Sequence, residues 1–147
     1  MRIAPLLLGL AVAGCTAGVD TIGAIGAPRP EVLRDAEGYA IASCLAHQTH
    51  LYLKDQGDAW ASAIVQRGKG PVEHLFAIDD AVKNEIAKGR MAVIRAETGT
   101  EKDKTAPVLY CGEIIDAPSV RAEIQNAITK LDSFYGKQKT ADSKNPE

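Results

Sequence analysis

The sequence contains few aromatic residues, and its positive and negative charges nearly cancel. One tryptophan, four tyrosines and two phenylalanines leave the core to be built mainly from Ala, Leu, Ile and Val, a composition that suits close-packed helices better than a β-sandwich. The formal net charge is −2, and no basic stripe with interleaved aromatic residues occurs, which argues against nucleic-acid binding. We therefore expect an all-α protein without a nucleic-acid partner.

Familiar catalytic and metal-binding motifs are also missing from the sequence. It has no glycine-rich phosphate loop, no nucleophile elbow, and neither H-E-x-x-H nor C-x-x-C spacing. His47 and His50 are three positions apart and could be combined with Asp55, Asp58 or His74, but such spacing is common by chance. We predict no enzyme activity, no cofactor and no metal site.

Two further groups of reactive side chains have simpler explanations than catalysis. Cys44 and His47 are one helical turn apart, but both fall on the apolar stripe of a predicted helix, whereas a catalytic thiolate needs an accessible, electropositive setting. Asp79, Asp80 and Glu85 alternate with lysines in a pattern typical of a solvated helix face. Neither group predicts a catalytic site.

The N-terminal end has the three parts of a lipoprotein signal peptide. Arg2 precedes an apolar stretch over residues 3–13, and Val12-Ala13-Gly14-Cys15 matches a bacterial lipobox. The apolar stretch is about half of the roughly 20 residues that a membrane-spanning helix needs. We predict that residues 1–14 are removed and that Cys15 is lipidated. An ordinary secretory signal that contains a cysteine is the alternative.

We divide the chain into four predicted parts. The signal peptide (1–14) is followed by a lipidated tether (15–30), whose glycines and prolines interrupt regular structure. A helical domain is predicted for residues 31–136, and a polar, disordered tail for 137–147. The lipid would hold the domain at the periplasmic face of the cell envelope, and Thr16 favours the outer membrane.

Two cysteines remain once Cys15 is assigned to the lipid. In an oxidising compartment, the pair Cys44 and Cys111 favours a disulfide. Because the loop between them is long, the chain-entropy stabilisation would be about 4 kcal/mol. Two free, buried thiols are the alternative.

Apolar residues recur at helical spacing through the central domain. The first predicted helix runs from Glu31 to Lys54, with Leu51 and Tyr52 on its buried face, and Gly57 separates it from a second. The remaining helices are predicted at 58–67, from Pro71 to before Gly89, at 107–116 and at 118–136. Residues 90–97 fit either a helical turn or a short strand. We expect a compact bundle of about five helices, with the first linked by the disulfide to the fourth or fifth.

The segments around the two cysteines follow a recognisable order. They are Ala40-Ile41-Ala42-Ser43-Cys44-Leu45-Ala46, a Lys54-Asp55 turn, the small-residue helix Asp58-Ala59-Trp60-Ala61-Ser62-Ala63, Val108-Leu109-Tyr110-Cys111 and an amphipathic last helix. This order resembles the immunity proteins of type VI secretion amidase effectors, which are small, all-helical periplasmic proteins. The resemblance covers residues 33–132, and here a lipobox stands where a plain secretory signal is expected.

The resemblance implies a non-enzymatic inhibitor of a peptidoglycan-degrading amidase toxin, and also a homodimer. Such proteins occlude the active-site cleft of the toxin, often through a protruding loop. The matching effector-binding loop here consists of Glu97, Thr98, Gly99, Thr100, Glu101, Lys102, Asp103 and Lys104. Its acidic side chains would suit a basic rim or an active-site histidine. A solvated connection of mixed charge is the alternative for this segment.

Two other functions stay open on the sequence alone. A structural or accessory envelope lipoprotein, acting as a helical scaffold in a secretion or assembly machine, would share the export signal, tether and disulfide. A small envelope hydrolase would use His47 or His74. A neighbouring gene for a secreted hydrolase would favour the inhibitor, whereas a machine operon would favour the scaffold.

Overall fold

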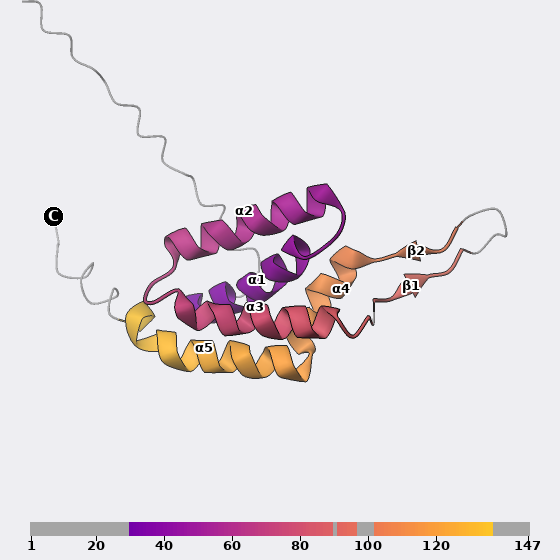
Figure 1. Cartoon of the computed structure of the whole chain (residues 1–147). Coiled ribbons are helices and arrows are strands. Elements are labelled where there is room, and N and C mark those ends of the chain that lie inside the picture. The colour runs from indigo at the N-terminus through magenta and orange to yellow at the C-terminus, as the bar shows by residue number, and fades with distance from the viewer. Residues whose placement is uncertain (1–29, 90, 97–101, 137–147) are drawn as a thin grey trace, which may run out of the picture.

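The computed structural model describes residues 30–89, 91–96 and 102–136. Within these ranges the chain forms five α-helices and a two-stranded sheet (Figure 1), which confirms the predicted all-α fold. The elements in chain order are α1 (Glu31–Ala46), α2 (Leu51–Arg67), α3 (Glu73–Ile86), β1 (Val93–Ile94), β2 (Lys104–Thr105), α4 (Pro107–Glu113), the 3-10 helix η1 (Ile114–Asp116) and α5 (Pro118–Gly136). The predicted signal peptide, Cys15, the tether up to residue 29 and the tail 137–147 lie outside the described residues.

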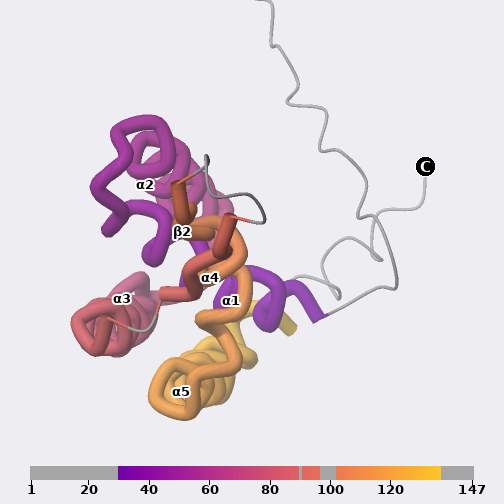
Figure 2. Tube along the Cα trace, turned by 90° about the vertical axis from the view of Figure 1, so that its right-hand side faces the viewer, coloured from indigo at the N-terminus to yellow at the C-terminus, as the bar shows by residue number. Residues whose placement is uncertain are grey.

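Helix α1 is the centre of the bundle, and α2, α3, α4 and α5 all contact it (Figure 2). Most of its buried residues are small, so several helices can approach it from different sides; they are Ala36, Gly38, Ala40, Ala42, Ser43 and Cys44. Larger apolar side chains from the surrounding helices complete the core; they are Ile64, Leu75, Ile78, Val82, Val120, Ile124 and Leu131. The predicted apolar stripes of α3 and α5 are thus confirmed as core-facing.

The predicted boundary between the first two helices is wrong. Helix α1 ends at Ala46 rather than Lys54, and α2 already begins at Leu51. As a result Leu51 and Tyr52, predicted on a buried face, are 75% and 64% exposed. The apolar spacing continues across the polar turn of residues 47–50, so periodicity alone does not reveal that turn.

Gly57, predicted to break the helix, lies inside α2 at its closest approach to α1. A Cβ atom at this position would lie 2.2 Å from the backbone nitrogen of Ala46 and 2.6 Å from the carbonyl oxygen of Ala42. Gly57 is therefore required by packing between two helices, because only a residue without a side chain lets the backbones come this close.

A buried carboxylate joins α1, α2 and α5 at one end of the bundle. Asp35 is 3% exposed. Its Oδ1 accepts hydrogen bonds from Nη2 and Nε of Arg67 at 2.6 and 3.1 Å, and its Oδ2 accepts one from the Tyr135 hydroxyl at 2.9 Å. Burial, and then the hydrogen bond to Asp35, raise the pKa of Tyr135 to about 12. The charge of Asp35 is thus compensated by ion pairs with Arg67 and, at 3.8 Å, with Arg34, and by one neutral donor, Tyr135.

Candidate binding site

The two strands form a narrow antiparallel hairpin that projects from the helical bundle (Figure 1). Val93 is paired with Thr105, and Ile94 with Lys104. Two further hydrogen bonds extend the hairpin on either side of these pairs. The Ala106 N–H donates to the Ala92 carbonyl at 3.3 Å, and the Ala96 N–H donates to Oδ1 of Asp103 at 3.2 Å. The chain therefore leaves the bundle and returns to it along two adjoining arms.

Apolar side chains are exposed along this hairpin and at its base. Val93 and Ile94 are 55% and 56% exposed, and Val108 and Leu109 at the start of α4 are also exposed. An isolated two-stranded hairpin is only marginally stable in water, and neighbouring exposed apolar side chains in a small protein often mark an interaction surface. We define the hairpin surface as residues 92–96 and 102–106 together with Val108 and Leu109.

The predicted effector-binding loop falls only partly within the described residues. Glu97, Thr98, Gly99, Thr100 and Glu101 lie outside them. Lys102 and Lys104 are exposed on the returning arm, whereas the Asp103 carboxylate accepts the bond from Ala96. The predicted effector-binding loop lies in the polar segment alone and does not include Val93 and Ile94 of the hairpin surface. The available signal was the β-branched pair itself, which is typical of a strand.

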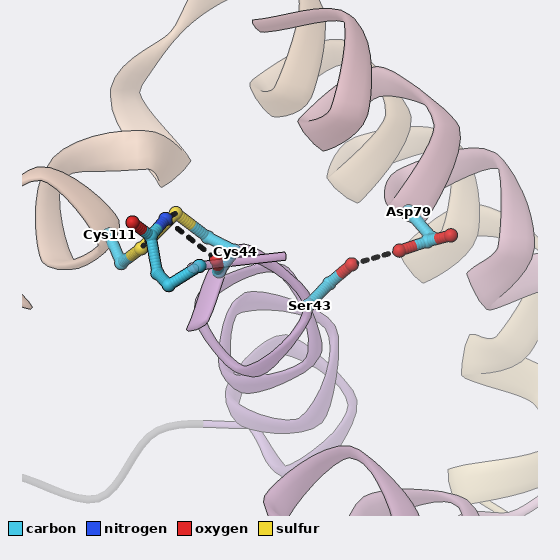
Figure 3. The surroundings of a disulfide bond; sticks show 5 residues. Ser43, Cys44, Asp79 and Cys111 are labelled. Carbon is cyan, nitrogen blue, oxygen red and sulfur yellow. Dashed lines mark hydrogen bonds between the residues drawn. A yellow bond between two sulfur atoms is a disulfide. The ribbon is translucent and has the colours of Figure 1, made fainter. Parts of the chain in front are cut away.

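The base of the hairpin is held by the predicted disulfide, which is confirmed between Cys44 of α1 and Cys111 of α4 (Figure 3). Both cysteines are fully buried. The side-chain amide of Gln48 donates to the Cys44 carbonyl at 3.0 Å and to Sγ of Cys111 at 3.4 Å. Because both sulfur atoms are in the disulfide, Cys44 has no thiolate to serve as a nucleophile beside His47.

A second polar cluster joins the opposite side of α1 to α3. Asp79 accepts hydrogen bonds from the Ser43 hydroxyl (Figure 3), from Nε2 of His47 at 2.8 Å and from Nζ of Lys83 at 2.5 Å. Partial burial acts to raise the pKa of Asp79, but the bonds from Lys83, Ser43 and His47 outweigh it and hold this pKa below its ordinary value. The histidine that the sequence placed on the core side is a third exposed at its side chain.

This cluster does not have the geometry of a serine nucleophile with its base. In such a pair the hydroxyl donates to the imidazole, and a carboxylate orients the imidazole from its far side. Here Ser43 and His47 both bond Oδ1 of Asp79, so the hydroxyl proton points at the carboxylate. The arrangement serves to connect two helices.

Of the three acidic residues predicted on a solvated face of α3, Asp80 is exposed as predicted, whereas Asp79 and Glu85 are less solvated. The side chain of Asp79 is only 24% exposed, and Glu85 as a whole is 4% exposed. Glu85 pairs with Lys88 at 2.5 Å and accepts a hydrogen bond from Ser119 of α5 at 3.2 Å. The predicted i,i+4 pairing does occur between Asp79 and Lys83, but Asp79 and Glu85 also connect α3 to its neighbours, which a helix pattern alone does not show.

Within the described ranges, no group of three or more His, Cys, Asp or Glu side chains is placed to hold a metal ion. The same part of the chain has no helix that is both long and apolar enough to cross a membrane. No protein-family model, curated protein or solved structure matches the chain.

Proposed function

We propose that the protein is a non-enzymatic immunity protein that binds a peptidoglycan-degrading, amidase-type toxin and occludes its active-site cleft. The projecting hairpin is the observation that most supports this function. Active sites are concave, and a narrow hairpin can enter such a cleft where a flat helical face cannot. Since its base is tied to α1 by the disulfide, the hairpin would lose little conformational freedom on binding.

The side chains of the hairpin suit an interface with an apolar centre and a charged margin. Val93 and Ile94 offer apolar area that is accessible before binding. Arg95, Lys102 and Lys104 add exposed positive charges around them. Interfaces of this kind bury an apolar centre for affinity and use the charged rim for orientation.

We also propose that Cys15 carries lipid and that the protein is anchored at the periplasmic face of the envelope, on the outer membrane. The buried Cys44–Cys111 disulfide supports an oxidising compartment. A toxin delivered from outside would meet the inhibitor there before it reaches its peptidoglycan substrate.

The first test is a pull-down with the whole chain carrying a C-terminal tag, expressed in its own bacterium. Membrane and secreted fractions would be analysed by mass spectrometry. We expect recovery of one small hydrolase whose activity on peptidoglycan is abolished by an equimolar amount of the protein. Recovery of the protein without any hydrolase, or of a hydrolase that stays active in the complex, would contradict the proposal.

Two changes to the hairpin would then locate the binding surface. A Val93→Thr, Ile94→Thr variant keeps β-branched side chains but removes apolar area, and we expect affinity for the hydrolase to fall at least tenfold. Replacement of residues 101–104 by Gly-Ser should have a similar effect. Val65→Thr, at an exposed valine of α2, is the matched control. Equal affinities for all variants would exclude the hairpin from the interface.

The alternative is an accessory envelope lipoprotein that acts as a scaffold, and the exposure of α2 favours it. Only Gly57 and Ile64 are buried among the 17 residues of this helix. The surface of α2 includes the exposed apolar side chains of Leu51, Tyr52 and Trp60. If the protein is a scaffold, the pull-down should recover subunits of an envelope machine. A Tyr52→Ala change should then reduce the amount of these subunits recovered, whereas the hairpin variants should not.

A further inference from the structure

Helix α4 has very little packing of its own. Of its seven residues, only Cys111 is buried. Val108, Leu109, Gly112 and Glu113 are exposed. A helix this short is not stable in water without tertiary contacts. Besides Cys111, the partly buried Tyr110 is the side chain of α4 that packs against the core. The covalent bond to Cys44 is therefore a large part of what holds α4 against α1.

The hairpin takes its orientation from α4. Strand β2 ends at Thr105 and α4 begins at Pro107, so only Ala106 separates them. On the other arm, several residues separate the end of α3 from β1, and Gly89 in this connection has φ +66°. The direct connection to α4 is thus the shorter and stiffer of the two attachments.

The rest of the bundle depends little on this region. The buried core consists mainly of residues from α1, α2, α3 and α5, whereas α4 and η1 contribute Cys111 and Ile114. Helix α5 also packs directly against α1 and α3. Loss of α4 from its place would remove Cys111 and the partly buried Tyr110 from the core and leave the contacts among the four longer helices.

We infer that the Cys44–Cys111 disulfide fixes the position of the hairpin on the bundle. Reduction of this disulfide releases α4 and the hairpin as one local unit, while α1, α2, α3 and α5 stay packed. In the reduction, a dithiol supplies two electrons and two protons. The S–S bond becomes two thiols, and the dithiol becomes a disulfide. The weak hydrogen bond from Gln48 to the Cys111 sulfur is then insufficient to hold α4.

The disulfide would also regulate inhibition, a consequence that rests on the proposed function. In a reduced chain the hairpin would no longer be held in one position. Binding in a cleft would then have to order the hairpin, which costs conformational entropy. Inhibition would therefore be acquired only on oxidation, after export, and the chain would be a weak inhibitor before it leaves the cytoplasm.

The test measures backbone order by NMR relaxation on the full isotope-labelled chain, oxidised and then reduced with dithiothreitol. In the oxidised protein we expect order parameters of about 0.85 across residues 104–113 and in the helices. After reduction, those of residues 104–113 should fall below about 0.6, while α1, α3 and α5 keep their values. Because a buried disulfide is reduced slowly, a Cys44→Ala, Cys111→Ala variant provides the same comparison without reductant.

Tyr135→Phe is the matched control, since it removes a hydrogen bond at the far end of the bundle and should leave the order of α4 unchanged. An α4 that stays rigid without the disulfide would overturn the inference, and so would a loss of order throughout the bundle. Binding of the oxidised chain to the hydrolase from the pull-down is measured separately. If the oxidised chain fails to bind the hydrolase, the proposed function is contradicted, but the role of the disulfide in holding α4 and the hairpin is not.

Discussion

The contact between α1 and α2 gives a sharp test of the packing, because the same substitution should have opposite effects at two glycines. In Gly57→Ala the new methyl group would meet three backbone atoms of α1, at 2.2, 2.6 and 2.7 Å. In Gly112→Ala, on the exposed side of α4, the methyl group would have no heavy atom within 4 Å. Both glycines lie within helices, so the gain in intrinsic helix propensity is comparable.

The magnitude follows from the distances. Ordinary van der Waals contact begins at 3.4 Å, so α1 and α2 would have to separate by roughly 1 Å at their crossing. Overpacking of this kind costs about 1–3 kcal/mol, and here the upper end applies because helix backbone atoms cannot rotate away. The higher helix propensity of alanine offsets about 1 kcal/mol. We therefore expect Gly57→Ala to lower the free energy of unfolding by about 2 kcal/mol.

Thermal unfolding followed by circular dichroism measures this difference. A loss of about 2 kcal/mol should lower the Tm of a domain of this size by roughly 10 °C. Gly112→Ala should leave the Tm unchanged or raise it by a few degrees, since only the propensity gain applies. If Gly57→Ala unfolds at or above the temperature of the unaltered protein, the close approach of α1 and α2 is refuted.

Two further predictions concern the hydrogen bonds to Asp35 and Asp79. Tyr135→Phe removes the hydrogen bond to Asp35, so the free energy of unfolding in urea should fall by about 1 kcal/mol; an unchanged value would mean that the bond adds nothing. In an ultraviolet pH titration, the same variant should lose the phenol that ionises near pH 12. The folded-state pKa of Asp79 lies below the ordinary value of 3.8. The stability that the Asp79 carboxylate adds is therefore present above that pH and is lost as the pH falls through the folded-state pKa. Asp79→Asn should therefore reduce the loss of stability on acidification below about pH 4, and an identical pH dependence would exclude Asp79 as a cause.

The fold class, the core faces of the later helices and the pairing of the cysteines can be predicted from the amino-acid sequence. Leu75, Ile78 and Val82 repeat at the spacing of one helix face, and such a face must be buried somewhere. Cys44 and Cys111 are the pair left when Cys15 is assigned to the lipid. These features follow from local spacing and composition, which do not depend on the arrangement of the rest of the chain.

The end of the first helix, the role of Gly57 and the residues of the hairpin depend instead on contacts between distant parts of the folded chain. Glycine has a low helix propensity, so Gly57 is predicted to break the helix. In the structure its lack of a side chain instead lets α2 lie against α1. Val93 and Ile94 form a strand because the returning arm with Lys104 and Thr105 lies beside them. In each case the deciding contact joins residues that a local sequence pattern does not relate, so only the folded chain reveals it.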